Sequence, residues 1–143
     1  MTDHNALHDI DAGTLLPQGK AFRTVDTLLY CDSERTISET LICPENPFCG
    51  KDGKFMEAGL LENIAQTCAL RMGYMCRQNN GTVPKAGVIA AVRRMDIHCP
   101  VNVGDTLRTE VVVEAEAFGM LSCRGRVERY GILVCEAELR LML

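Results

Sequence analysis

The longest periodic stretch of the chain runs from Ala58 to Gln78 and predicts one substantial helix. At about 100° per residue, apolar and small residues fall within one broad arc, whereas Asn63, Gln66 and Arg77 fall opposite. The pattern therefore predicts a helix buried along the arc and exposed on the other side. The arc consists of Leu61, Ile64, Ala65, Cys68, Met72 and Met75.

Glu62 lies at the edge of this arc, on a line with Ala58, Ala65, Ala69 and Gly73. A carboxylate in this place borders a groove of small residues, and such a groove can admit a thin, flexible ligand. The alternative is that Glu62 only complements the helix dipole near the N-terminus. Periodicity alone leaves both interpretations open.

Two strands are predicted before the helix, from Phe22 to Tyr30 and from Thr36 to Ile42, with a polar turn between them. Residues 43–56 contain two prolines and two glycines, which predicts a loop that leads to the helix. No Ser, Thr, Asp or Asn stands directly before Ala58, so the first helical amides lack a side-chain cap and can face a ligand oxygen.

The sequence after the helix is dominated by strand patterns. One strand is predicted from Gly87 to Cys99, followed by a turn at 100–105. Apolar and polar residues then alternate along three further segments, 107–117, 121–128 and 133–141, separated by turns at Gly119 and Gly131. Alternation over three consecutive strands predicts an antiparallel meander with one wet face. About six strands and one apolar helix predict an α+β fold in which the sheet curls around the helix.

Composition fits one domain over residues 13–143, preceded by a flexible polar tail at 1–12. The chain has 143 residues, of which 47% are hydrophobic, enough to bury a core without staples. A net charge of −4 argues against nucleic acid or an anionic membrane as the main partner. No apolar run is long enough to span a membrane or resembles a signal peptide, so we expect a cytoplasmic protein.

The cysteines do not form a metal-binding pattern. Eight are scattered along the chain without CxxC or Cys/His spacing, and several occupy apolar positions of the predicted helix and strands. This distribution is typical of free thiols in a reducing compartment. We therefore expect no structural metal.

Several short motifs, in this order and on these elements, resemble the hotdog-fold 3-hydroxyacyl-acyl-carrier-protein dehydratases. The motifs are LLPQGKAFRTVDTLL at 15–29, NPF at 46–48, EAGLLENIAQT at 57–67, PVNVGDTL at 100–107 and CEAELRL at 135–141. The resemblance covers nearly everything after residue 12. It is greatest to the dehydratase-like hotdog proteins of aryl polyene pigment pathways, whose loop before the helix is similarly short.

The resemblance implies a homodimer or heterodimer with a tunnel at the subunit interface for an acyl chain on phosphopantetheine, and no other cofactor. In these dehydratases a helix carboxylate and a loop histidine from different subunits move the protons of a β-elimination. The matching carboxylate is Glu62, and amides near Gly59 would polarise the thioester carbonyl. The residues expected to line the substrate site are Ala58, Gly59, Ala65, Ala69, Asn46 and Phe48.

The sequence departs from the family at the histidine. The loop at 43–56 contains none, and its polar or reactive residues are Asn46, Cys49, Lys51 and Asp52. The remaining candidate, His98, lies on the strand before Pro100, where a structural role is the simpler interpretation.

Three functions are therefore open. The first is a dehydratase acting on 3-hydroxyacyl groups held on acyl carrier protein, in fatty acid or polyene biosynthesis. The second is a non-catalytic acyl-binding subunit that completes a heterodimer with a histidine-bearing hotdog partner, and the third is an acyl thioesterase. Lys85, Arg93 and Arg94 form the best basic group for a carrier protein, although they equally fit a solvated strand face.

Overall fold

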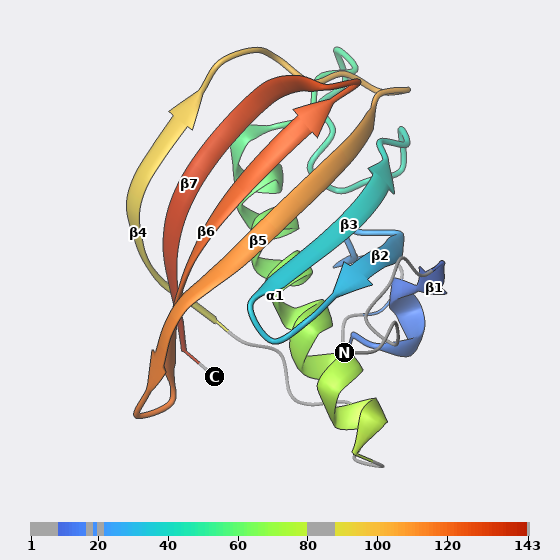
Figure 1. Cartoon of the computed structure of the whole chain (residues 1–143). Helices are drawn as coiled ribbons and strands as arrows, with labels where there is room; N and C mark the ends of the chain where they lie inside the picture. Colours follow the sequence, from blue (N-terminus) through green and yellow to red (C-terminus); the bar gives the residue numbers. More distant parts are fainter. Residues whose placement is uncertain (1–8, 17–18, 20–21, 80–87, 143) are drawn as a thin grey trace.

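A single antiparallel sheet curls around one long helix in the computed structural model, which describes residues 9–16, 19, 22–79 and 88–142 (Figure 1). The helix is α1 (Glu57–Gln78), and a short 3-10 helix, η2, covers Ala12–Thr14. The strands follow the order β1-β2-β3-β5-β6-β7-β4 across the sheet. Their bounds are β1 Ile10–Asp11, β2 Thr27–Cys31, β3 Arg35–Leu41, β4 Val88–Ile97, β5 Thr106–Ala117, β6 Met120–Arg129 and β7 Ile132–Met142. The predicted α+β arrangement is thereby confirmed.

The C-terminal meander forms because two tight turns keep β5, β6 and β7 in register. Phe118 and Gly119 join β5 to β6 with φ of 54° and 74°, and Tyr130 and Gly131 join β6 to β7 with φ of 52° and 80°. Positive φ at both central residues gives the twist that two-residue hairpins require. The turns predicted at the two glycines are confirmed.

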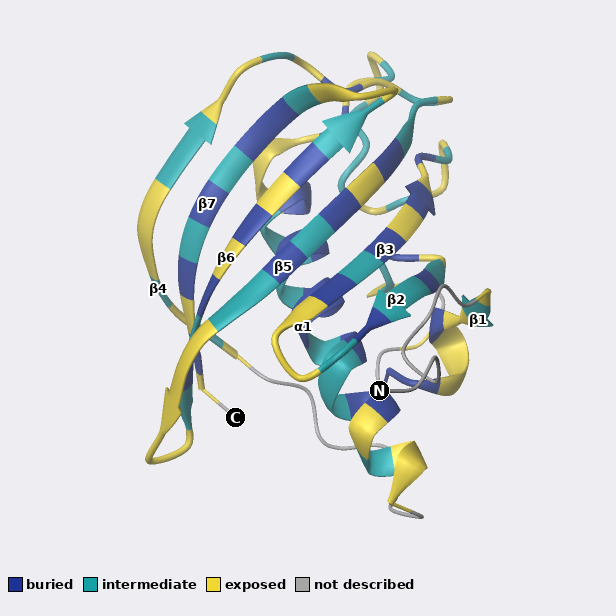
Figure 2. Ribbon diagram, viewed as in Figure 1, coloured by how far each residue is buried: buried dark blue, intermediate teal, exposed yellow. Residues whose placement is uncertain are grey.

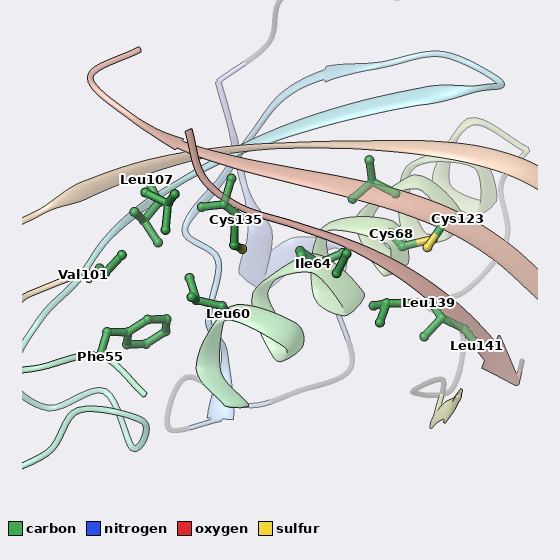
Figure 3. Close-up of a cluster of buried hydrophobic side chains, with 14 of the residues drawn as sticks. Phe55, Leu60, Ile64, Cys68, Val101, Leu107, Cys123, Cys135, Leu139 and Leu141 are labelled. Carbon is green, nitrogen blue, oxygen red and sulfur yellow. The ribbon is translucent and has the colours of Figure 1, made fainter. Parts of the chain in front are cut away.

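The core lies between the concave face of the sheet and α1. Figure 3 shows helix residues Leu60 and Ile64 facing side chains of β5, β6 and β7. A Cβ atom added to Gly125 of β6 would lie 2.4 Å from Ile64 Cγ2, so glycine lets the helix sit directly on the strand. On the other side of α1, a Cβ at Gly73 would lie 2.1 Å from the carbonyl oxygen of Leu15. The helix is therefore in close contact on two sides.

The prediction of which helix face is buried was partly wrong. Asn63 and Gln66, expected to face solvent, are 0% and 2% exposed, whereas Met75, expected in the buried arc, is 38% exposed. The exposed residues of α1 gather toward the two ends of the helix (Figure 2). The two amides are buried because their side chains find hydrogen-bond partners in the segment before β2. A periodicity argument counts polarity and cannot see such partners.

The sheet begins earlier in the sequence than predicted, whereas the strand predicted from Phe22 to Tyr30 begins later. Ile10 and Asp11 pair with Leu28 and Thr27, so the end of the expected tail belongs to the sheet, while residues 1–8 lie outside the described part of the chain. The strand expected from residue 22 starts at Thr27. The reason is that residues 22–24 bond to helix side chains instead of to a neighbouring strand.

No helix in the described ranges has the length and apolar character needed to cross a bilayer. Within the same ranges, no three His, Cys, Asp or Glu side chains gather as a metal site. All eight cysteines are free thiols.

Candidate functional site

The loop before α1 fixes where the helix begins. Asn46 shapes the loop, because its Oδ1 accepts a hydrogen bond from the Phe48 amide at 2.9 Å. The Met56 amide then donates to the Phe48 carbonyl at 2.8 Å, and the Phe55 amide donates to Val101 at 2.8 Å. Hydrogen bonds therefore connect the loop to itself and to the turn at 100–105, and they fix the position at which the helix starts.

The first turn of α1 is tightly packed at Gly59. A Cβ at this position would lie 2.5 Å from Phe55 Cζ and 2.7 Å from Phe48 Cβ. The rings of Phe48 and Phe55 form an edge-to-face pair with their centroids 6.4 Å apart. Met56, the N-cap, makes no side-chain capping bond, as the sequence predicts. The Gly59 amide itself donates to the Met56 carbonyl at 2.9 Å. Polarisation of a substrate's thioester carbonyl would therefore come from neighbouring amides of the first turn. This role of the helix start stays a prediction.

Glu62 precedes Ile64 by two residues, about 200° around the helix, so it lies away from the face of α1 that packs on the sheet. Its side chain is half-buried, and the line of small residues continues from exposed Ala58 through half-buried Ala65 and Ala69. The line ends at Ala69, because the next small residue, Gly73, is buried against Leu15 and offers no open space. The line of small residues is therefore shorter than predicted, and a groove along it stays a prediction.

A buried polar cluster stands beside Glu62. Gln66 Nε2 donates to Glu62 Oε2 at 3.0 Å, and Gln66 Oε1 accepts from the Thr24 amide at 2.7 Å. Asn63 Nδ2 donates to the Thr24 carbonyl at 2.7 Å, and Asn63 Oδ1 accepts from Thr109 Oγ1 at 2.5 Å. Asn63 and Gln66 were not among the residues predicted for the site. The available signal was the four-residue spacing of Glu62 and Gln66, which places them on one helix face.

Two candidates for a second proton-transfer group, Cys49 and Asp52, make their hydrogen bonds within the loop and not with Glu62. Burial raises the pKa of the Cys49 thiol, with the Cys43 thiol and Glu45 adding to the effect. The Cys49 thiol donates to the Cys43 carbonyl at 3.3 Å, so it is a neutral side chain in the loop. Asp52 Oδ1 accepts from the Lys54 amide at 3.1 Å.

His98 is an exposed residue just after β4. Its Nε2 lies 3.5 Å from Glu136 Oε2. The imidazole thus has a surface carboxylate as its neighbour, and its structural role stays a prediction.

The structure separates the other predicted binding residues. Asn46 lines a pocket of about 870 Å³ beside β2 and β3, together with Arg23 and Thr40, and Glu62 does not line this pocket. Arg93 and Arg94 are both exposed on β4. Arg94 donates to Asp96 at 2.7 Å and borders a groove of about 300 Å³ that mixes arginines with carboxylates.

Lys85, the third member of the predicted basic group, lies outside the described residues. Of the predicted basic group, the structure therefore describes only Arg93 and Arg94.

Strand β4 is the last strand of the sheet on its side, and no other strand of the described residues pairs with its outer edge (Figure 1). Val88 and Val92 on this strand are 63% and 44% exposed, and Ile97 at its end is also exposed. An unpaired edge with apolar side chains is a ready template for another chain.

Known proteins share this architecture. The chain is similar to the dehydratase heterocomplex ApeI:P from Xenorhabdus doucetiae, with 14% identity, a TM-score of 0.87 and coverage of 94% of this chain and 91% of that chain. It is also similar to the E. coli PaaI protein from the phenylacetic acid degradation operon, with 14% identity, a TM-score of 0.61 and 81% coverage of both chains.

A hypothetical thioesterase with coenzyme A from Streptococcus pneumoniae shares the fold as well, with 11% identity, a TM-score of 0.63 and coverage of 85% of this chain and 87% of that chain. Among curated proteins, none matches the sequence significantly. Residues 10–143 match the ApeP-like family, described as ApeP dehydratase. The chain therefore belongs to the ApeP-like dehydratase family and has the hotdog fold that its motifs predict.

Proposed function

We propose that this protein supplies one half of a dehydratase site for 3-hydroxyacyl groups carried on phosphopantetheine of an acyl carrier protein. The observation that carries the proposal is the half-buried Glu62 carboxylate, which accepts a hydrogen bond through Oε2 and lies near Ala58, Ala65 and Ala69 along the helix. Membership of a dehydratase family supports it. The line of alanines would leave room for the acyl chain.

The reaction needs two proton movements. A base removes a proton from Cα of the thioester, the bond from Cβ to oxygen breaks, and the hydroxyl leaves with a proton as water, giving the enoyl thioester. Loss of one positioned acid or base costs about 10²–10⁴-fold. Because the loop at 43–56 has no histidine and Cys49 is a neutral thiol, we infer that the second group comes from another subunit.

The open edge of β4 is the surface we propose for that partner. Backbone groups along an edge strand pair readily with a second strand, and exposed Val88 and Val92 add apolar area to the contact. The structural similarity to a dehydratase heterocomplex supports a hetero-oligomeric hotdog partner. Arg93 and Arg94, on the same strand, are the proposed contacts for the acidic carrier protein.

The test is enoyl formation from a 3-hydroxyacyl carrier-protein substrate, followed by absorbance. We expect weak or no turnover by the protein alone and clear turnover after addition of a histidine-bearing hotdog dehydratase subunit. Glu62→Gln should abolish the restored activity while dimerisation, measured by light scattering, is unchanged. Glu57→Gln is the matched control, because Glu57 is an exposed carboxylate in the first turn of the same helix.

Robust turnover by the protein alone would overturn the need for a partner. Full activity of the Glu62→Gln mixture would overturn the acid/base role and identify a non-catalytic subunit. Release of free thiol from an acyl thioester would identify a thioesterase instead.

A further inference from the structure

The side-chain amide of Gln66 has all of its hydrogen-bonding groups engaged. Its Nε2 donates to the Phe22 carbonyl at 2.9 Å and to Glu62 Oε2 at 3.0 Å, and its Oε1 accepts from the Thr24 amide at 2.7 Å. The opposite orientation of the amide would place its oxygen against two acceptors and its NH₂ against a donor. Gln66 is also only 2% exposed, so a single orientation is enforced.

The backbone that holds Gln66 is itself fixed. Thr24 is fully buried, and its carbonyl accepts from Asn63 Nδ2 at 2.7 Å and from Thr40 Oγ1 at 3.1 Å. The amide of Gln66 therefore connects Glu62 to a segment that α1 and β3 hold from two sides. A carboxylate bound to such an anchor loses freedom of rotation before any substrate arrives.

The two oxygens of Glu62 differ as a result. Oε2 accepts from Gln66, whereas Oε1 receives no hydrogen bond from the described residues. We propose that Gln66 is a positioning residue that holds Oε2 and so leaves the other oxygen, Oε1, to exchange the proton. This proposal rests on the proposed function, in which Glu62 is the acid/base group.

The first test observes the hydrogen bond without any assay of activity. In protein labelled with ¹⁵N, Glu62→Ala should move one of the two Gln66 side-chain amide protons upfield, because that proton loses its carboxylate acceptor. The other proton, bound to the Phe22 carbonyl, should stay in place. Glu57→Ala is the control and should move neither. Unchanged Gln66 resonances in Glu62→Ala would overturn the proposal, whatever the protein's activity.

The second test uses the active mixed dimer. Gln66→Met keeps the length of the side chain and removes all three bonds, and we expect kcat to fall about 10–100-fold with KM unchanged, since a misplacement of about 1 Å costs about 10²-fold. Ser38→Ala is the control, because it removes a buried hydrogen bond between β3 and α1, to Thr67, that touches neither Glu62 nor Thr24. At temperatures where it is folded, it should keep its kcat.

Two results in this assay would overturn the proposal. One is a wild-type kcat for Gln66→Met, and the other is an equal loss of kcat in Ser38→Ala, which would assign the effect to loss of buried hydrogen bonds in general. If the wild-type mixture shows no dehydration, the proposed function fails, and the amide resonances still decide whether Gln66 holds Glu62.

Discussion

Gly125 is the position where one added methyl group has the clearest consequence. Its place in β6 lies under Ile64, and a Cβ would come within 2.4 Å of Ile64 Cγ2 and 2.9 Å of Ile64 Cγ1. We expect Gly125→Ala to lower the free energy of unfolding by about 1–3 kcal/mol, the usual cost of overpacking a filled core. Chemical denaturation followed by circular dichroism measures the change.

The control for this prediction is Gly19→Ala, because nothing lies within 4 Å of a Cβ at Gly19. Ile64→Ala in the Gly125→Ala background should cost less than the sum of the two single changes, since the clash is then removed. Unaltered stability of Gly125→Ala would show that the helix can shift away from the strand.

The buried cysteines behave as apolar residues with weak donors. Figure 3 shows the Cys68 and Cys123 side chains meeting between helix and sheet. The hydrogen bond with Cys123, together with burial, raises the pKa of Cys68. Burial raises the pKa of Cys135 to about 12. Neutral, enclosed thiols of this kind pack the core and react slowly.

Among the structural elements, the hairpin of β2 and β3 depends on the charged form of Asp32. Its Oδ1 accepts from the amides of Glu34 and Arg35 at 2.8 Å and 2.7 Å, and its Oδ2 accepts from the Tyr30 hydroxyl at 2.8 Å. Partial burial raises the pKa of Asp32, but these donors and the charge of Arg35 outweigh it and lower the pKa below its ordinary value. The folded protein therefore favours the carboxylate.

A pH dependence follows from the lowered pKa. The stabilisation is fully present above the unfolded pKa of about 3.9 and is lost as the pH falls through the lower folded pKa. Asp32→Asn should therefore lower Tm at pH 7, and the difference from wild type should shrink as the pH falls below about 4. Glu45→Gln, at an exposed position, should show no such gap. A gap in Tm that is the same at every pH would contradict the role of the charge.

The elements themselves were largely predictable from sequence, and their partners were not. Alternation placed the three C-terminal strands and their turns, and periodicity placed α1 within a residue of its observed start. The buried side of α1 was misjudged at Asn63 and Gln66, because their bonding partners at residues 22–24 are distant in sequence. Glu62 could be singled out from its small neighbours, and Gln66 from its four-residue spacing, whereas the bonds from Gln66 to residues 22–24 could not be foreseen.

For the whole molecule, the open edge of β4 leads to a prediction about assembly. Val92→Lys places a charge on the exposed edge, and lysine there opposes strand pairing. We expect association with a hotdog partner to weaken at least tenfold, because a charge would have to be desolvated in the interface, while Tm of the isolated chain changes little. Analytical ultracentrifugation of mixtures gives the dissociation constant.

Ile132→Lys is the matched control, since Ile132 is an exposed apolar residue at the start of β7 and away from the free edge. Weakening of association by both substitutions to the same degree would point to charge in general. No weakening by Val92→Lys would place the partner on another surface.

The two glycine contacts of α1 also have a consequence for how the proposed site could choose among substrates. Gly125 brings the strand backbone against Ile64, and Gly73 brings the helix backbone against the Leu15 carbonyl. A helix gripped in this way can neither slide nor roll without breaking close packing. If Glu62 acts as proposed, it therefore cannot travel to meet acyl chains of different lengths. Discrimination among chains would then take place on entry, through the fixed length of the proposed acyl site, and not through adjustment of the helix.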